Sequence, residues 1–313
     1  IRRQRQMCIR DRHSTFCIMR RILLEKDMSS GYYAFLVFLG GCSYGILSTI
    51  VKLAYEAGFT LSHVSGSQGF WGMALFWLVA WKWRPETISL KKMAVLIFSG
   101  LPMGLTSIFY YRALETLDAS LAIIFLFQFV WIGTIFDILF FKKIPGCRKA
   151  VSILILLAGS VLASGLEIGR GISFPVGVFW GALSAVSYSL VILASGVVGL
   201  GISPVFKSAM MSVGAAAVIF FYLPPVFLTD ADLFLSVMPY GILLGLFGIV
   251  VPPFLFSVGI PKIGPGLGSI LTASELPTAL LMSFFVLHEP VGVYQWIGAA
   301  LIFVGIVTGN VEK

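Results

Sequence analysis

Charged side chains are scarce in this sequence, and their scarcity excludes most classes of soluble protein. Charged residues make up 12% of the 313 residues, whereas hydrophobic residues make up 58%. A soluble domain carries about 25% charged residues. So little charge cannot cover so much apolar side chain with a polar surface, and a disordered chain is excluded by the same apolar content. The composition indicates an integral membrane protein, whose first partner is the lipid bilayer.

The formal net charge of +8 does not indicate an anionic partner. Residues 1–27 hold eight of the 22 Lys and Arg residues, and from Met28 onward 14 basic and 11 acidic residues remain. Residues 6–12 resemble the translated end of a transposon used to prepare sequencing libraries. We therefore expect residues 1–27 to be a non-native or disordered tail that precedes a natural start at Met28. We expect no nucleic-acid partner.

Cysteine is also rare in the sequence, and the motifs of nucleotide-driven pumps are missing. Of the four cysteines, Cys8 and Cys17 lie in the tail, and Cys42 and Cys147 are far apart and follow no pattern. The sequence therefore predicts neither a disulfide framework nor a zinc site. It also contains no Walker-type motif, so the chain by itself is not an ATP-driven pump. We expect no cofactor and no metal.

One short motif resembles that of a serine hydrolase, but its context argues against an enzyme. Residues 41–45 match the G-x-S-x-G pattern. That motif works because a strand–turn–helix exposes the serine, whereas here it lies inside a continuous apolar run. His63 and His288 lie at the ends of apolar runs rather than at a matching depth. We predict that the protein is not an enzyme.

Long apolar runs dominate the rest of the chain. A membrane-spanning helix needs about 20 mostly apolar residues, and its backbone must be satisfied within the segment. This rule predicts an all-α membrane protein with ten spans, at 31–53, 62–81, 93–112, 119–141, 150–166, 174–196, 203–226, 233–258, 264–288 and 293–310. Eleven Lys and Arg residues fall on one side of these spans and three on the other, with the tail omitted. The bias predicts that both termini are cytoplasmic.

The sequence also contains a faint internal repeat. A shift of 146 places residues 111–163 on 257–309 without a gap, and a shift of 144 places Ser43 and Tyr44 on Ser187 and Tyr188. We therefore divide the chain into a first five-helix repeat at 28–168 and a second at 169–313. Because five is odd, the second copy enters the membrane from the opposite face. Such inverted repeats are typical of secondary transporters, and a duplicated scaffold is the alternative.

Several stretches resemble a known family. The segment at 43–55, Glu275-Leu-Pro277, His288-Glu289 and the closing helix at 295–305 are similar to the EamA family of the drug/metabolite transporter superfamily. The resemblance implies a metabolite transporter, more often an exporter, whose cavity is lined by spans one, three, four, six, eight and nine. The chain departs from the family pattern at Lys143, where an acidic residue is frequent. That departure removes any coupling role for this loop.

Glycine and proline interrupt two corresponding spans. The third span carries Pro102 and Gly104, and the eighth carries Gly248, Pro252 and Pro253. Proline frees a backbone carbonyl and kinks a helix, and paired interruptions in transporters mark the binding site. We therefore expect site backbone at Pro102, Gly104 and Pro252, and also at Pro277 of the ninth span, with ordinary kinking as the alternative.

Glu275 is the ionisable residue nearest the centre of a predicted span, two residues before Pro277. An acid or base at that depth costs roughly 2.5–3.5 kcal/mol, so it needs a reason. Either the carboxyl takes a proton or faces a cationic substrate group, or it bonds the carbonyls loosened by Pro277. We predict that Glu275 binds substrate or couples transport to protons.

Three further polar residues are candidates for the pocket at the repeat interface. Tyr44 and Tyr188 are related by the repeat and lie in mid-span, and Gln128 lies in mid-span within the fourth helix. Hydrogen bonding between helices is the alternative role for each. Several Gly-x-x-x-Gly pairs also occur, which allow packing within the chain or a homodimer.

Together these patterns predict a secondary transporter of small organic metabolites in the cytoplasmic (inner) membrane. It would work by alternating access, as an exporter, with protons as the coupling ion to test. Two alternatives stay open: an uncoupled facilitator or channel, and a non-transporting membrane scaffold.

Overall fold

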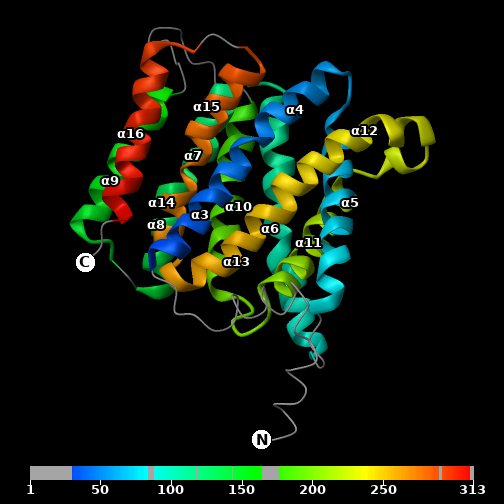
Figure 1. The fold of residues 1–313 in the computed structure, drawn as a ribbon, viewed down its shortest axis with the longest axis horizontal. Coiled ribbons are helices and arrows are strands. Elements are labelled where there is room, and N and C mark those ends of the chain that lie inside the picture. The colour runs from blue at the N-terminus through cyan, green and yellow to red at the C-terminus, as the bar shows by residue number, and fades with distance from the viewer. Residues whose placement is uncertain are drawn as a thin grey trace, which may run out of the picture.

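The computed structural model describes residues 30–83, 88–117, 119–142, 144–163, 176–288 and 291–310. The expected tail at 1–27, Lys143 and the junction near 168 lie outside these residues. Within the described residues all regular elements are helices, which confirms the all-α prediction. Figure 1 shows the helices running side by side in one bundle.

The helices follow the predicted apolar runs closely. They are α3 (Ser30–Gly45), α4 (Leu47–Glu56), α5 (Leu61–Ala80), η1 (Trp81–Trp83), α6 (Leu90–Leu114), α7 (Ala119–Phe127), α8 (Phe129–Phe141), α9 (Cys147–Ala163), α10 (Val176–Val197), α11 (Pro204–Tyr222), η2 (Val226–Leu228), α12 (Ala231–Leu244), η3 (Gly245–Val250), α13 (Val251–Ile263), α14 (Pro265–Thr272), α15 (Glu275–Val286) and α16 (Val293–Asn310).

Eight helical stretches within the described residues are long and apolar enough to cross a membrane. They are Ser30–Glu56, Leu90–Leu114, Ala122–Phe141, Val176–Val197, Pro204–Tyr222, Ala231–Ile263, Pro265–Val286 and Val293–Asn310. Of the ten predicted spans, α5 and α9 are not among the eight. Helix α9 has 17 described residues, and α5 carries His63, Gln68 and several serines in its first half. Ten spans therefore remain a prediction.

The outer faces of the bundle are apolar. Large side chains such as Phe98, Leu139 and Phe221 are more than half exposed on these faces. Exposed apolar surface on this scale marks a membrane or partner interface rather than a water-facing surface. The protein is therefore a multi-pass membrane protein.

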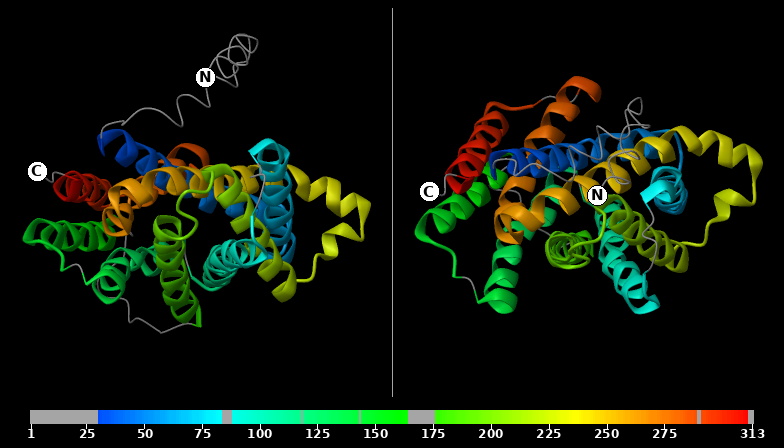
Figure 2. Two further views of the ribbon diagram at one scale, coloured as in Figure 1. Left: turned by 90° about the horizontal axis from the view of Figure 1, so that it is seen from below. Right: turned by 60° about the horizontal axis from the view of Figure 1, so that its bottom comes forward.

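Helices from the two halves pack in matched pairs. Helix α9 packs along α16 at one edge of the bundle. The pair α6–α11 has a counterpart in α5–α12, and the pair α6–α10 has one in α3–α13. Helices α3 and α13 pack side by side, as the blue and orange ribbons of Figure 2 show. If each helix is replaced by its counterpart in the other half, the first pair maps onto itself and each of the other pairs maps onto its named counterpart.

Small residues allow this close packing. A Cβ atom on Gly100 or Gly104 would run into the backbone of α11, at Met211 and Ala215 respectively. The glycines of four other Gly-x-x-x-Gly pairs also approach other helices of the same chain; the pairs are Gly41 and Gly45, Gly177 and Gly181, Gly241 and Gly245, and Gly305 and Gly309. Packing within the chain therefore accounts for these motifs, and the homodimer stays a prediction.

Four of the long helices are interrupted in their middle. Helices α3 and α4 meet at Ile46, α7 and α8 meet at Gln128, and α14 and α15 meet at Ala273 and Ser274. Between α12 and α13 the chain forms the wide π-helical turn η3. These interruptions bring backbone polar groups and special side chains to the centre of the bundle.

Candidate functional site

A pocket lies at the centre of the bundle, where the interrupted helices meet. Its walls come from both halves of the chain, on the α4 side of the interruptions. The lining residues are Tyr44, Gly45, Leu47, Ser48, Met103, Thr106, Ser107, Tyr110, Tyr111, Ile123, Leu126, Tyr188, Val191, Gly248 and Glu275.

Glu275 is placed by the interruption of its helix. It is the first residue of α15, directly after the turn at Ala273 and Ser274. The Ser274 hydroxyl donates to the Phe38 carbonyl over 2.7 Å, which ties this turn to α3. Gly45 of α3 lies directly against the Glu275 carbonyl, where any Cβ would collide. The two helices therefore hold the Glu275 backbone at the pocket wall.

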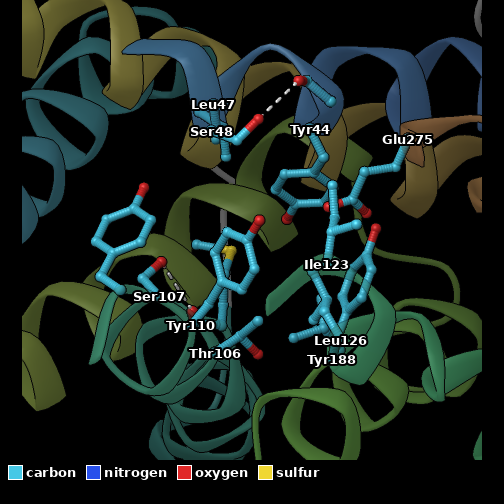
Figure 3. A pocket seen from close by; sticks show the side chains of 15 residues that line it. Tyr44, Leu47, Ser48, Thr106, Ser107, Tyr110, Ile123, Leu126, Tyr188 and Glu275 are labelled. Carbon is cyan, nitrogen blue, oxygen red and sulfur yellow. Dashed lines mark hydrogen bonds between the residues drawn. The ribbon is translucent and has the colours of Figure 1, made fainter. Parts of the chain in front are cut away.

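The Glu275 carboxyl is buried and incompletely bonded. The residue is 7% exposed, and its Oε2 atom has no hydrogen-bond partner within the described part of the chain. It points toward the hydroxyl ends of Tyr44 and Tyr188 (Figure 3). A buried, unsatisfied carboxyl is costly, so such groups in membrane proteins mark functional sites.

Tyr44 and Tyr188, the pair related by the repeat, touch each other. Their ring centroids are 5.3 Å apart with an interplanar angle of 90°, an edge-to-face contact. Tyr188 also packs on Phe129, with centroids 4.6 Å apart. The structure therefore brings three of the predicted site residues, Tyr44, Tyr188 and Glu275, to one wall of the pocket.

Gln128 lies elsewhere, although it stands at the interruption between α7 and α8. Its Nε2 atom donates to the Ile124 carbonyl over 3.0 Å, and its Oε1 atom accepts from the Trp131 indole over 2.7 Å. Gln128 does not line the pocket. Both bonds are local to the interrupted helix α7–α8, so they differ from the alternative considered for Gln128, which was a hydrogen bond to another helix.

The predicted helix-breaking residues surround the pocket without lining it. Pro102 lies inside α6, and its carbonyl accepts from the hydroxyl of the pocket residue Thr106 over 2.7 Å. Gly104 packs on α11. Pro252 is the second residue of α13, just after η3, and Pro277 is buried in the first turn of α15. They shape the helices that carry the lining residues.

The π-helical turn η3 contributes backbone to the site. Gly248 lines the pocket, and the Phe247 carbonyl accepts from the Ser43 hydroxyl over 2.9 Å. The wider turn frees this carbonyl from its usual partner along the helix, and π-turns of this kind are frequent at functional sites. The expected interruption of the eighth span therefore takes the form of a π-helix.

Sequence reasoning missed the polar residues on the opposite wall. Tyr110 and Tyr111 line the pocket, and the Tyr111 hydroxyl donates to Oε1 of Gln68 over 3.1 Å. The amide of Gln68 donates in turn to the Leu244 carbonyl at the start of η3 over 3.4 Å. A glutamine within an apolar run, Gln68, was the signal that the sequence offered. The sequence did not indicate that its partner would be Tyr111 on another helix.

The bundle is closed on the other side of the interruptions, where α8 packs against α14. Asp137 on α8 accepts from the Lys149 ammonium over 3.1 Å, and both groups lie against Gly266 near the start of α14. Gly133 contacts Ser269 one turn further in. The first and second halves of the chain therefore meet tightly below the pocket.

Comparisons with known proteins identify a matching family and a solved structure of similar fold. Residues 175–310 match the family described as the EamA-like transporter family. A solved structure described only as the crystal structure of a protein is similar in fold, with a TM-score of 0.69, 16% sequence identity and coverage of 89% of this chain and 96% of that chain. At this identity the likeness concerns the fold alone. Among curated proteins no sequence matches the chain.

Proposed function

Because the chain belongs, through residues 175–310, to the EamA family of the drug/metabolite transporter superfamily, we propose that it is a secondary transporter of small organic metabolites. It works by alternating access in the cytoplasmic membrane, with both termini in the cytoplasm, and exports its substrate in exchange for protons. The observation that carries this proposal is the buried, unsatisfied Glu275 in a pocket walled by both halves of the chain.

The proposal includes two inverted repeats of five spans, with α5 and α9 as the second and fifth. Two observations support it. The interruptions at Gln128 and Ser274 are separated by the 146 residues of the sequence repeat and have nearly the same backbone angles. The helix contacts also form matched pairs between the halves. Rocking one repeat against the other around a central site is the motion that such folds use.

The arrangement of the pocket supports alternation between two openings. The lining residues lie on the α4 side of the interruptions, whereas Asp137, Lys149 and Gly266 hold α8 and α14 together on the other side. Opening the second side requires these contacts to separate. Glu275 lies at the pocket wall between the two sides, so its carboxyl is positioned to exchange a proton for substrate in either state.

Transport from reconstituted vesicles tests the proposal. Proteoliposomes loaded with a metabolite mixture are given an imposed pH gradient, and the loss of each compound is followed by mass spectrometry. Wild type, Glu275→Gln, Glu115→Gln and empty vesicles are compared. Glu115 is the matched control because it is an exposed carboxylate paired with Arg112 outside the pocket.

We expect gradient-dependent loss of particular compounds from wild type and Glu115→Gln vesicles, and none from Glu275→Gln. Equal loss from wild type and Glu275→Gln, insensitive to the gradient, would contradict proton coupling and favour an uncoupled facilitator. Loss no greater than from empty vesicles across a broad panel would contradict transport and favour the scaffold alternative.

A further inference from the structure

The chemistry of the pocket points to a particular substrate class. We propose that it binds an organic cation that carries an alkylated ammonium group on an apolar body. The proposal rests on the transport function proposed above and concerns the same site. It is carried by the charge, the aromatic walls and the shape of the pocket.

The pocket has a negative group and no basic one. Among its 15 described lining residues, Glu275 is the single acid, and none is lysine, arginine or histidine. Within the described part of the chain, the ion pair between Asp137 and Lys149 lies outside this pocket. A buried carboxylate without a counter-charge is strongly disfavoured. A cationic ligand would supply that charge, and a proton would replace it when the pocket is empty.

Tyrosine rings surround the carboxylate. Tyr44, Tyr110, Tyr111 and Tyr188 all line the pocket, and the first, second and fourth lie close enough to Glu275 to interact with its charge. Figure 3 shows Tyr44, Tyr110 and Tyr188 projecting into the space from different helices. The face of an aromatic ring attracts a cation, and cages of such rings recognise alkylated ammonium groups.

One of these tyrosines also carries a buried hydroxyl without a protein partner. The Tyr110 hydroxyl forms no hydrogen bond within the described part of the chain, and the residue is 7% exposed, whereas the Tyr188 hydroxyl lies beside Glu275 and Thr272. Buried hydroxyls are normally bonded, so that of Tyr110 indicates a polar group or water in the occupied pocket. Together with Oε2 of Glu275 it defines a polar corner for the ligand.

The remaining lining is mostly apolar and argues against a bare metal ion as the preferred ligand, since the hydroxyls of Ser48, Thr106 and Ser107 donate to carbonyls three or four residues earlier in the chain. Its apolar side chains are those of Leu47, Met103, Ile123, Leu126 and Val191. A Ca²⁺ ion takes six to eight oxygen ligands, whereas this pocket offers one carboxylate. The apolar side chains suit the hydrocarbon part of an organic cation.

Binding of a cation and of its uncharged isostere tests this inference. Tritiated benzyltrimethylammonium is bound to the purified full chain in detergent, and neopentylbenzene, the same shape with carbon in place of nitrogen, is the competitor. Wild type is compared with Glu275→Gln, Tyr44→Leu and Tyr44→Phe. Tyr294→Leu is the control, because Tyr294 is 73% exposed on α16 and does not line the pocket.

We expect Glu275→Gln to weaken binding by about 10- to 100-fold, through loss of the Coulombic attraction between the carboxylate and the quaternary ammonium group. Tyr44→Leu should weaken it by about 2- to 30-fold through loss of the ring. Tyr44→Phe keeps the ring and should bind nearly as wild type, as should Tyr294→Leu. Wild-type binding should weaken in mildly acidic buffer, because a protonated Glu275 is neutral, and this dependence should vanish in Glu275→Gln.

Equal competition by neopentylbenzene, or no binding of the cation, would overturn the substrate class. If metabolite efflux from the vesicles still required Glu275, the transport proposal would survive that failure. Cation binding with the expected dependence on Glu275, but without any transport in vesicles, would support the binding site and contradict the transport proposal.

Discussion

The interrupted helices α7–α8 and α14–α15 have the same backbone and different chemistry. At their interruptions Gln128 has φ and ψ of −58° and −14°, and Ser274 has −58° and −16°. The next residue is Phe129 in one half and Glu275 in the other, and both are buried beside Tyr188. The difference indicates that the repeat supplies the shape of the site, whereas its charge comes from the second half alone.

The helices that cross these two positions differ as well. Ser189 of α10 donates its hydroxyl to the Phe129 carbonyl over 3.1 Å. At the equivalent place in the other half, Gly45 of α3 lies directly against the Glu275 carbonyl without any side chain between them. At this position, Gly45 allows α3 to approach the Glu275 backbone closely, whereas Ser189 of α10 holds the Phe129 backbone by a hydrogen bond. Helix α3 ends at this glycine, whereas α10 continues unbroken.

The largest effect is expected from moving the charge to the other half. In the double variant Glu275→Phe with Phe129→Glu, the two side chains are exchanged on nearly identical backbones. We expect no gradient-dependent efflux above empty vesicles, because Phe129 packs on Tyr188 and does not line the pocket. Efflux measured in proteoliposomes checks this. Restored transport would show that the two positions are equivalent and would contradict the claim that only the second half can supply the charge of the site.

A smaller but clear effect is expected at the close approach. Gly45→Ala places a Cβ atom against the Glu275 carbonyl and the backbone of Ala279. Overpacking of this kind costs typically about 1–3 kcal/mol. We expect a lower melting midpoint of the purified protein and weaker efflux. An unchanged midpoint would indicate that α3 and α15 are not held as tightly as described.

The counterpart in the first half should be milder. Ser189→Ala removes one hydrogen bond to the Phe129 carbonyl and leaves no collision. The expected loss of stability is about 1 kcal/mol, with efflux retained. The same thermal measurement serves for both variants, and a greater loss for Ser189→Ala than for Gly45→Ala would reverse the predicted order.

The smallest effect is expected at Gln128. Gln128→Leu removes side-chain bonds to the Ile124 carbonyl and the Trp131 indole, which lie outside the pocket. We expect the affinity for benzyltrimethylammonium to change by about twofold or less, the range of substitutions away from a site. Binding to the purified variant tests this. A tenfold loss would bring Gln128 back into the site.

Much of the fold was predictable from the sequence because hydropathy determines where helices cross a membrane. The apolar runs gave each helix to within a few residues, and the glycines and prolines near Gly248 and Pro252 indicated the interruption now seen as η3. The break at Ile46 was not predicted, because no proline marks it and the whole run from 31 to 53 is apolar.

The site was predictable only where a residue type was unusual at its depth. Glu275 stands out as an acid in mid-span, and Tyr44 and Tyr188 stand out through the repeat. The rotation of a helix about its axis is not encoded in an almost uniformly apolar sequence, so nothing distinguished the orientation of Gln128 from that of Gln68. The link from Tyr111 through Gln68 to η3 joins three helices, and a single sequence carries no sign of it.

The exchange of a proton for substrate at Glu275 is the central claim, and proton release on binding tests it most directly. Benzyltrimethylammonium is added to the purified protein in weakly buffered, mildly acidic solution that contains a pH-sensitive dye. We predict release of protons from wild type in proportion to the cation bound, and none from Glu275→Gln. Binding by wild type without proton release, or equal release from both proteins, would contradict the claim.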